Sequence, residues 1–330
     1  MALLPPPASF FALGELLAGV AQLVRALPCH GRGCRFESGR SRTEKRNIQL
    51  WGIFFFLICE SDSIWSGLLR RSFNVDESLA QMKPKTPVPT SFKDLFYVVS
   101  DKEDGNLSYN WGEQEGVLKA RRDFFKRIGV SPADCVGMSL IHKDGVKLVD
   151  SKDRMDILKG VGSPEVDALI TNEKGLYLFL LTGDCQPLIY YDSKNRVLAL
   201  VHLSWKNTEM KLASKVIKTM QTNFGSNPRN VVVYIGPSIQ KDSYIFSSEE
   251  IAQKDISDWS KHVEKLPNER VAIDLFSYNQ RVLMDAGVPK ENILNSGIDT
   301  YSSPEYFSHY RSKRTGEPEG RFATVVGIKK

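Results

Sequence analysis

Cysteine and histidine are both scarce in this sequence, which contains only five of each among its 330 residues. The cysteines have no regular spacing and form no Cys-x-x-Cys pair, so a disulfide framework is not indicated. After residue 81 the chain holds two cysteines and four histidines. These are too few ligands for a protein with several copper centres.

Long apolar runs and a strong excess of one charge are missing as well. The most apolar run, residues 50–59, has ten residues, roughly half of the ~20 that a membrane-spanning helix needs. The first basic residue, Arg25, follows the N-terminal apolar stretch, which is the wrong order for a secretory signal. The formal net charge of +5 gives no argument for nucleic-acid binding. We therefore expect a cytoplasmic protein that binds neither membranes nor nucleic acid.

The first 81 residues differ from the rest of the chain and show no pattern of a packed core. Residues 19–42 can be back-translated into codons that resemble the D-arm and then the T-arm of a transfer-RNA gene. We therefore expect residues 1–81 to be a non-native or disordered extension, read from a frame that begins too early, with Met82 as the true start. The alternative is a genuine disordered or targeting extension. The remaining 330 − 81 = 249 residues suit one compact domain.

Apolar periodicity after residue 81 predicts both strands and helices. Short apolar runs bounded by turn formers are typical of buried strands, and apolar residues at helical spacing are typical of amphipathic helices. We expect strands at residues 96–100, 178–181, 197–201, 230–235 and 321–328, and helices at 113–128, 209–224, 247–262 and 275–286. The prediction is a single α+β domain with a mixed β-sheet core flanked by helices. His262, with Lys261 and Glu264 nearby, is expected to be exposed.

Three metal-capable side chains lie near predicted apolar segments. Cys185 and His202 each follow a predicted strand, and His142 lies in an apolar segment upstream. One thiolate and two imidazoles suit zinc and leave its fourth position open for water. Two other interpretations fit the same residues: Cys185 is an ordinary core residue, or Cys185 and His202 act without metal as nucleophile and base.

The sequence around these residues resembles the pattern of one protein family. Six short segments resemble family patterns. Residues 182–187 (TGDCQP) resemble T-A-D-C-x-P, 202–207 (HLSWKN) resemble H-A-G-W-R-G, and 167–171 (DALIT) resemble D-A-L-I-T. Residues 236–239 (GPSI) resemble G-P-S-I, 307–311 (FSHYR) resemble F-x-S-x-R-R, and 320–321 (GR) resemble G-R. His142 lies at the position of the family's first histidine. The chain resembles the YfiH/PgeF family, labelled first multicopper polyphenol oxidase and later purine nucleoside phosphorylase. The order and spacing of the motifs make this match more specific than a single motif.

The resemblance implies a zinc site formed by His142, Cys185 and His202, with copper less suitable, beside a pocket for a purine nucleoside. Phosphorolysis of nucleosides, including methylthioadenosine, and deamination of adenosine are assigned to members of the family. The implied partners are therefore a purine nucleoside and phosphate. Zinc-bound hydroxide is able to attack purine C6, and Asp184 is the candidate carboxylate for moving the proton. In two competing interpretations Asp184 orients His202 or caps a turn.

Phosphorolysis also requires cationic groups that hold phosphate. Lys206, Arg311 and Arg321 are the candidates within the motifs, and Lys206 precedes a predicted helix whose N-terminus favours an anion. Arg121, on the predicted helix at 113–128, is either an anion ligand or a solvated residue.

The chain departs from the family pattern close to these residues. Lys206 replaces Arg, which turns a bidentate guanidinium into a point charge, Asn207 replaces Gly, and Ala120 replaces Asn. The metal ligands are intact while their surroundings differ, so the sequence defines the site better than the substrate. Two alternative functions stay open: a metal-free Cys–His hydrolase or deamidase, and a protein that edits or binds peptidoglycan precursors.

Overall fold

The computed structural model of the protein describes residues 92–160, 162–251 and 257–330. They belong to one compact unit that spans Val75–Lys330. The expected extension at residues 1–81 and the expected start at Met82 lie outside the described residues. Within the described residues, every helix is too short or too polar to span a bilayer.

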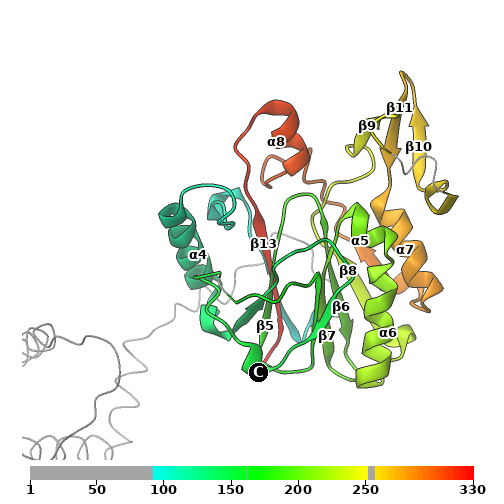
Figure 1. Ribbon diagram of the computed structural model, residues 1–330. Coiled ribbons are helices and arrows are strands. Elements are labelled where there is room, and N and C mark those ends of the chain that lie inside the picture. Colours follow the sequence, from blue (N-terminus) through cyan, green and yellow to red (C-terminus); the bar gives the residue numbers. More distant parts are fainter. Residues whose placement is uncertain (1–91, 161, 252–256) are drawn as a thin grey trace, which may run out of the picture. The chain divides into compact units, whose positions relative to one another are not determined.

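Two β-sheets form the centre of the domain (Figure 1). The four-stranded sheet has the order β1 (Leu95–Val99), β13 (Phe322–Ile328), β5 (Tyr177–Thr182), β2 (Cys135–Gly137). The six-stranded sheet has the order β12 (Ile293–Asn295), β8 (Val231–Ile235), β6 (Gln186–Asp192), β7 (Val197–Leu203), β4 (Ala168–Thr171), β3 (Val146–Leu148). Each sheet combines parallel and antiparallel pairs. The prediction of an α+β domain with a mixed β-sheet core is therefore confirmed.

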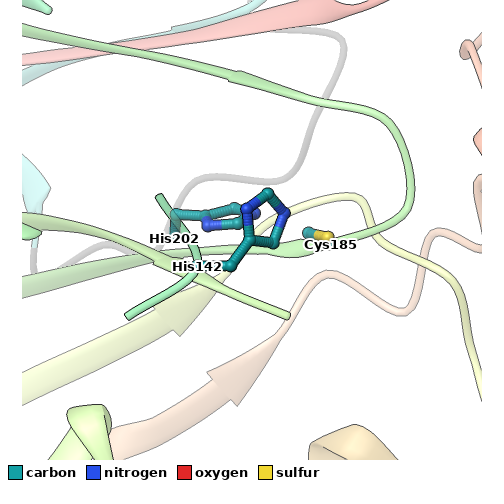
Figure 2. Close-up of side chains that lie close together, drawn as sticks. All are labelled: His142, Cys185 and His202. Atoms are coloured by element: carbon teal, nitrogen blue, oxygen red, sulfur yellow. The ribbon is translucent and has the colours of Figure 1, made fainter. Parts of the chain in front are cut away.

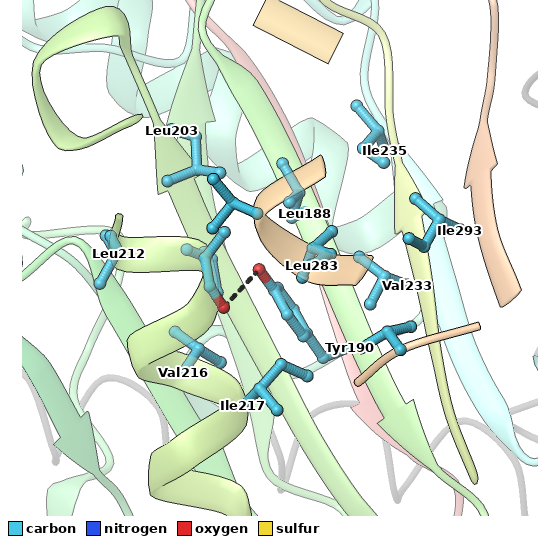
Figure 3. Packing of buried hydrophobic residues seen from close by; sticks show 14 of the residues in the cluster. Leu188, Tyr190, Leu203, Leu212, Val216, Ile217, Val233, Ile235, Leu283 and Ile293 are labelled. Atoms are coloured by element: carbon cyan, nitrogen blue, oxygen red, sulfur yellow. Dashed lines mark hydrogen bonds between the residues drawn. The ribbon is translucent and has the colours of Figure 1, made fainter. Parts of the chain in front are cut away.

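Helices cover the outer face of each sheet. On the four-stranded sheet, α4 (Gln114–Ile128) packs Phe124 and Phe125 against Phe179 of β5. On the six-stranded sheet, α6 (Leu212–Phe224) and α7 (Leu275–Asp285) cover the opposite side of the domain. Figure 3 shows this second core around Tyr190, whose hydroxyl donates a hydrogen bond of 3.4 Å to the Ala213 carbonyl. The domain thus has four layers, in the order helix, sheet, sheet, helices.

Alternate residues of β7 face opposite sides of the six-stranded sheet. Leu198 and Leu200 belong to the core between the sheets, whereas Ala199 and Val201 face the helices. Because side chains alternate along a strand, His202 at the end of β7 faces the space between the sheets. The strand therefore delivers an imidazole to the edge of the inner core.

The remaining elements are short and lie mostly at the ends of the layers. They are α5 (Trp205–Glu209), α8 (His309–Thr315), a small antiparallel sheet of β10 (Val263–Leu266), β11 (Arg270–Ile273) and β9 (Ile245–Ser247), and 3-10 helices at Lys102–Asp104, Pro132–Asp134, Ser151–Asp153, Pro228–Asn230, Ser257–Trp259 and Lys290–Asn292. The small sheet and α8 project beyond the same end of the two large sheets (Figure 1).

Two expectations about the segment after β9 are wrong. The described part of residues 247–262 contains the end of a strand, a turn and a 3-10 helix instead of the predicted α-helix. His262 is buried, with 8% of its surface exposed. Its ring lies 5.2 Å from the Tyr278 ring, and its Nδ1 is 2.7 Å from the Ser277 hydroxyl. The polar neighbours of His262 suggested exposure, but α7 covers this side chain.

The other predicted elements are confirmed to within a few residues, with one interruption. The predicted strands correspond to β1, β5, β7, β8 and β13, and the predicted helices at 113–128 and 275–286 correspond to α4 and α7. The helix predicted at 209–224 corresponds to α6, which begins only at Leu212. Lys211 precedes it with a left-handed φ of 56° and separates it from α5, which ends at Glu209.

Candidate metal centre and cavity

Three side chains from separate segments lie close together (Figure 2). His202 ends β7, Cys185 lies in the connection that leaves the four-stranded sheet after β5 and enters the six-stranded sheet at β6, and His142 lies in the loop before β3. Their ligand atoms lie within 4.8 Å of one another. The two rings are arranged edge to face, with centroids 5.0 Å apart. The structure therefore brings together the three residues predicted as metal ligands.

A buried carboxylate, Asp167, holds two of these residues in place. Its Oδ1 lies 2.8 Å from His202 Nδ1, and the backbone carbonyl of Asp167 accepts a hydrogen bond of 2.8 Å from the His202 N–H. The carboxylate also accepts backbone N–H bonds from Ile141, His142 and Lys143, at 3.0–3.3 Å. Asp167 thus fixes both the ring of His202 and the loop that carries His142. Asp167 opens the motif at residues 167–171, but the motif alone does not indicate this role.

The charges around the two histidines differ. Burial disfavours the charged form of His202, but the adjacent Cys185 and the Asp167 carboxylate outweigh it and raise the pKa of His202 to about 9. For His142, desolvation of the ring and the neighbouring His202 lower the pKa, although the residue as a whole is exposed. Burial opposes ionisation of Asp167, yet the hydrogen bonds from His202 and from the backbone keep its pKa below the ordinary value.

The donor set fits a tetrahedral zinc ion with one open position. Bond lengths of about 2.0–2.3 Å place the ligand atoms of such an ion about 3.3–3.7 Å apart. The ligand atoms lie within 4.8 Å of one another, which is slightly more than this, and His142 is the exposed member of the three. Because Asp167 holds Nδ1 of His202, Nε2 is the nitrogen directed to a metal.

A cavity of about 560 Å³ is lined in part by His142, Cys185 and His202. Its wall contains aromatic rings, of which Tyr109, Trp111 and Phe179 are the largest, together with His142, Cys185 and His202. Ligand pockets in proteins are commonly mostly apolar with a few convergent polar groups. The volume and lining suit a flat heteroaromatic ligand of nucleoside size.

Arg121 and Arg321 line this cavity, in different environments. Arg121 is 4% exposed, and its guanidinium donates to the Leu107 and Ile157 carbonyls and lies 4.4 Å from the Tyr109 ring centroid. Arg121 is therefore a buried residue that stabilises the cavity wall through these hydrogen bonds, and not the solvated residue that the amphipathic helix suggested. Arg321 lies 5.0 Å from the Trp111 ring centroid and forms an ion pair of 3.0 Å with Glu319.

The other two predicted cations do not line the cavity. Lys206 is exposed on α5, with its Nζ 5.5 Å from the Trp205 ring centroid. The nitrogens of Arg311 bind Glu317 and the carbonyls of the segment before α8, namely those of Thr300, Tyr301, Ser303 and Tyr306. Arg311 therefore anchors a loop, and its geometry gives no support to a role in phosphate binding.

Asp184 faces away from the cavity, although it precedes Cys185. Its carboxylate accepts hydrogen bonds of 2.7 Å from the Thr300 hydroxyl and 2.6 Å from the Tyr310 N–H. Burial raises its pKa against the effect of these bonds. Its φ of 92° is unusual for a residue other than glycine. Asp184 thus stabilises the turn that contains Cys185, whereas Asp167 orients the ring of His202.

The chain also matches known proteins over a long stretch of sequence, beyond the short motifs. A family model described as "Multi-copper polyphenol oxidoreductase laccase" matches residues 98–329. The chain belongs to this family. The resemblance seen in the motifs is therefore confirmed.

Curated relatives cover most of the domain. A "Purine nucleoside phosphorylase" of Bacteroides thetaiotaomicron is 31% identical over 261 residues, which are 73% of this chain and 94% of the relative. "Adenosine deaminase RL5" from an unknown prokaryotic organism is 31% identical over 65% of this chain and 80% of its own length. "Purine nucleoside phosphorylase YlmD" of Bacillus subtilis is 29% identical over 57% and 68%, respectively. The names of these relatives support the prediction that the chain is an enzyme.

Two solved structures show the same fold. Bacillus licheniformis YfiH superimposes with a TM-score of 0.67 at 22% identity, over 75% of this chain and 98% of that protein. YlmD from Geobacillus stearothermophilus gives the same TM-score and identity, over 73% and 94%. At this identity the likeness concerns the fold alone.

Replacing Asp167 tests whether it supports the metal ligands. Asp167→Asn removes the charge opposite His202 Nδ1, and loss of such a partner typically weakens metal binding about 10–100-fold. Chelator competition with zinc measures this affinity. Asp144→Asn is the matched control, because Asp144 forms only an exposed ion pair of 2.8 Å with Lys215. Equal zinc affinity in both variants would contradict the role given to Asp167.

Proposed function

We propose that the protein is a zinc-dependent purine nucleoside phosphorylase, which converts adenosine, inosine, guanosine or methylthioadenosine and phosphate into the free base and the ribose 1-phosphate. Deamination of adenosine is proposed as a second activity. One observation carries the proposal: the His142, Cys185 and His202 cluster opens into a cavity with aromatic walls, in a family whose relatives bear these two names.

The residues around the cavity suggest how a nucleoside and phosphate are held. The rings of Tyr109, Trp111 and Phe179 offer apolar surfaces for a purine. Arg321 brings a guanidinium to the cavity wall, where it is suited to a phosphate oxyanion. His142, Cys185 and His202 would hold zinc, which supplies a Lewis acid and an activated water when bound. In phosphorolysis a phosphate oxygen would bond to C1′ of the ribose as the C1′–N9 bond breaks, whereas in deamination water would add to C6 of the purine and ammonia would leave.

A multicopper oxidase is not supported by the residues. Within the described part of the chain, a single group of three or more ligand-capable side chains is found. Several copper ions need more ligands than this group provides.

A metal-free Cys185–His202 pair is the second candidate. It is favoured by the raised pKa of His202, to which a hydrogen bond with Cys185 contributes. A hydrolase of this kind would keep its activity in the presence of a chelator and lose it on thiol alkylation. A zinc enzyme would be inhibited by the chelator and recover when zinc is returned.

Removal of the Cys185 thiol tests the proposed activity directly. Incubation of the protein with adenosine and phosphate should give adenine and ribose 1-phosphate by mass spectrometry, and Cys185→Ala should lower the rate about 100-fold or more, since even groups that only support a ligand contribute 10–100-fold. Cys135→Ala is the control, because Cys135 is a buried thiol of the α4 core outside the cavity. Inosine formed without phosphate would identify the deaminase instead. An absence of product from all four nucleosides would contradict both activities and favour a binding protein.

Phosphate binding is tested by a pair of substitutions. We expect Arg321→Gln to raise the KM for phosphate about 10-fold, because a charge-assisted hydrogen bond contributes roughly 1.5–3 kcal/mol. Lys206→Gln should change it less than about twofold, because Lys206 lies outside the cavity lining and surface charges contribute little. A larger effect of Lys206→Gln would return phosphate to the first turn of α5, as the sequence motif suggested.

A further inference from the structure

A second group of charged side chains lies on the cavity wall, outside the metal cluster. His309, the first residue of α8, hydrogen-bonds through Nδ1 to Oε1 of Glu319. The same carboxylate oxygen lies 3.0 Å from Nη2 of Arg321. His309 and Arg321 both line the cavity, whereas Glu319 is behind them with 8% of its side chain exposed.

The buried Glu319 determines how the imidazole of His309 is presented. A carboxylate between a histidine and an arginine accepts hydrogen bonds from both, and these bonds outweigh burial and lower the pKa of Glu319. Because Glu319 accepts from Nδ1–H, the nitrogen of His309 that is not held by this carboxylate is Nε2. The side chain of His309 is 47% exposed, so a ligand in the cavity is able to reach the ring.

The other described histidines have different surroundings. His142 and His202 belong to the metal cluster, and His262 is buried against α7 and does not line the cavity. Among the described residues, His309 is therefore the histidine that lines the cavity without belonging to the ligand group. A histidine oriented by a carboxylate is a common arrangement for proton transfer.

We propose that His309 is the general acid that protonates N7 of the leaving purine, and that Glu319 is its positioning residue. The inference rests on the proposed phosphorolysis. A phosphate oxygen forms the new bond to C1′, the C1′–N9 bond breaks with its electron pair passing into the purine, and the Nε2 proton of the imidazolium moves to N7. The neutral imidazole keeps its Nδ1–H on Glu319 and recovers a proton from water.

A nucleoside that needs no protonation tests this step. In 7-methylinosine the base already carries a methyl group and a positive charge at N7, so it leaves without a general acid. We expect His309→Gln to lower kcat for inosine about 100-fold, within the range typical of general acid catalysis. The same variant should change kcat for 7-methylinosine less than about threefold.

Glu319→Gln tests the positioning role in the same assay. Because Glu319 also pairs with Arg321, the rates are compared at saturating phosphate. There Glu319→Gln should lower kcat for inosine about 10-fold and leave kcat for 7-methylinosine nearly unchanged, because only inosine needs the proton donor. A purely structural role of Glu319 would lower both rates together. Lys313→Ala, an exposed substitution on the same helix, is the control and should alter neither rate.

The outcomes separate this inference from the proposed function. Wild-type protein that phosphorolyses both nucleosides, with His309→Gln impaired on inosine alone, supports the general acid. Equal losses on both nucleosides, or no loss on either, would overturn it while leaving the phosphorylase intact. Wild-type protein that acts on neither of these nucleosides, nor on adenosine, guanosine or methylthioadenosine, would overturn the phosphorylase, and the general acid with it.

Discussion

The candidate site depends on one buried carboxylate, that of Asp167. It binds the ring of His202 on β7 and three successive N–H groups in the loop around His142. Without this acceptor the ring of His202, which is 2% exposed, would lose its partner at Nδ1, and an unsatisfied buried donor costs about 1–3 kcal/mol. The carboxylate is itself kept ionised by the same bonds. One residue therefore sets the relative position of two candidate ligands that are 60 positions apart in the chain.

The third candidate ligand, Cys185, is placed by the topology. The chain leaves the four-stranded sheet at Thr182 and enters the six-stranded sheet at Gln186, so Cys185 lies where the two sheets meet. Asp184 holds this short turn against the segment around Thr300 and Tyr310. The rigid ends of both sheets thus support the cluster, and the cavity forms between them and the loops that contain Tyr109 and Arg321.

The strands and the proximity of His142, Cys185 and His202 could be predicted from the sequence, because both leave local signals. Alternating or continuous apolar runs identify β5 and β7, and the ligands follow them directly. The roles of individual charged residues were predicted less well. Asp184 binds the Thr300 hydroxyl, 116 positions away in the sequence, and Arg311 binds the Thr300 carbonyl, 11 positions away. A sequence does not show which carbonyl or hydroxyl will satisfy a charge. The burial of His262 by α7 was hidden for the same reason.

The proposed metal centre is tested most directly by X-ray absorption at the zinc edge on the purified protein. We expect one zinc per chain, with a single sulfur at about 2.3 Å and nitrogen or oxygen neighbours at about 2.0–2.1 Å. The sulfur contribution should be absent from Cys185→Ala. A protein that binds no zinc when zinc is supplied, or a zinc ion without a sulfur neighbour, would contradict the assignment of His142, Cys185 and His202 as its ligands.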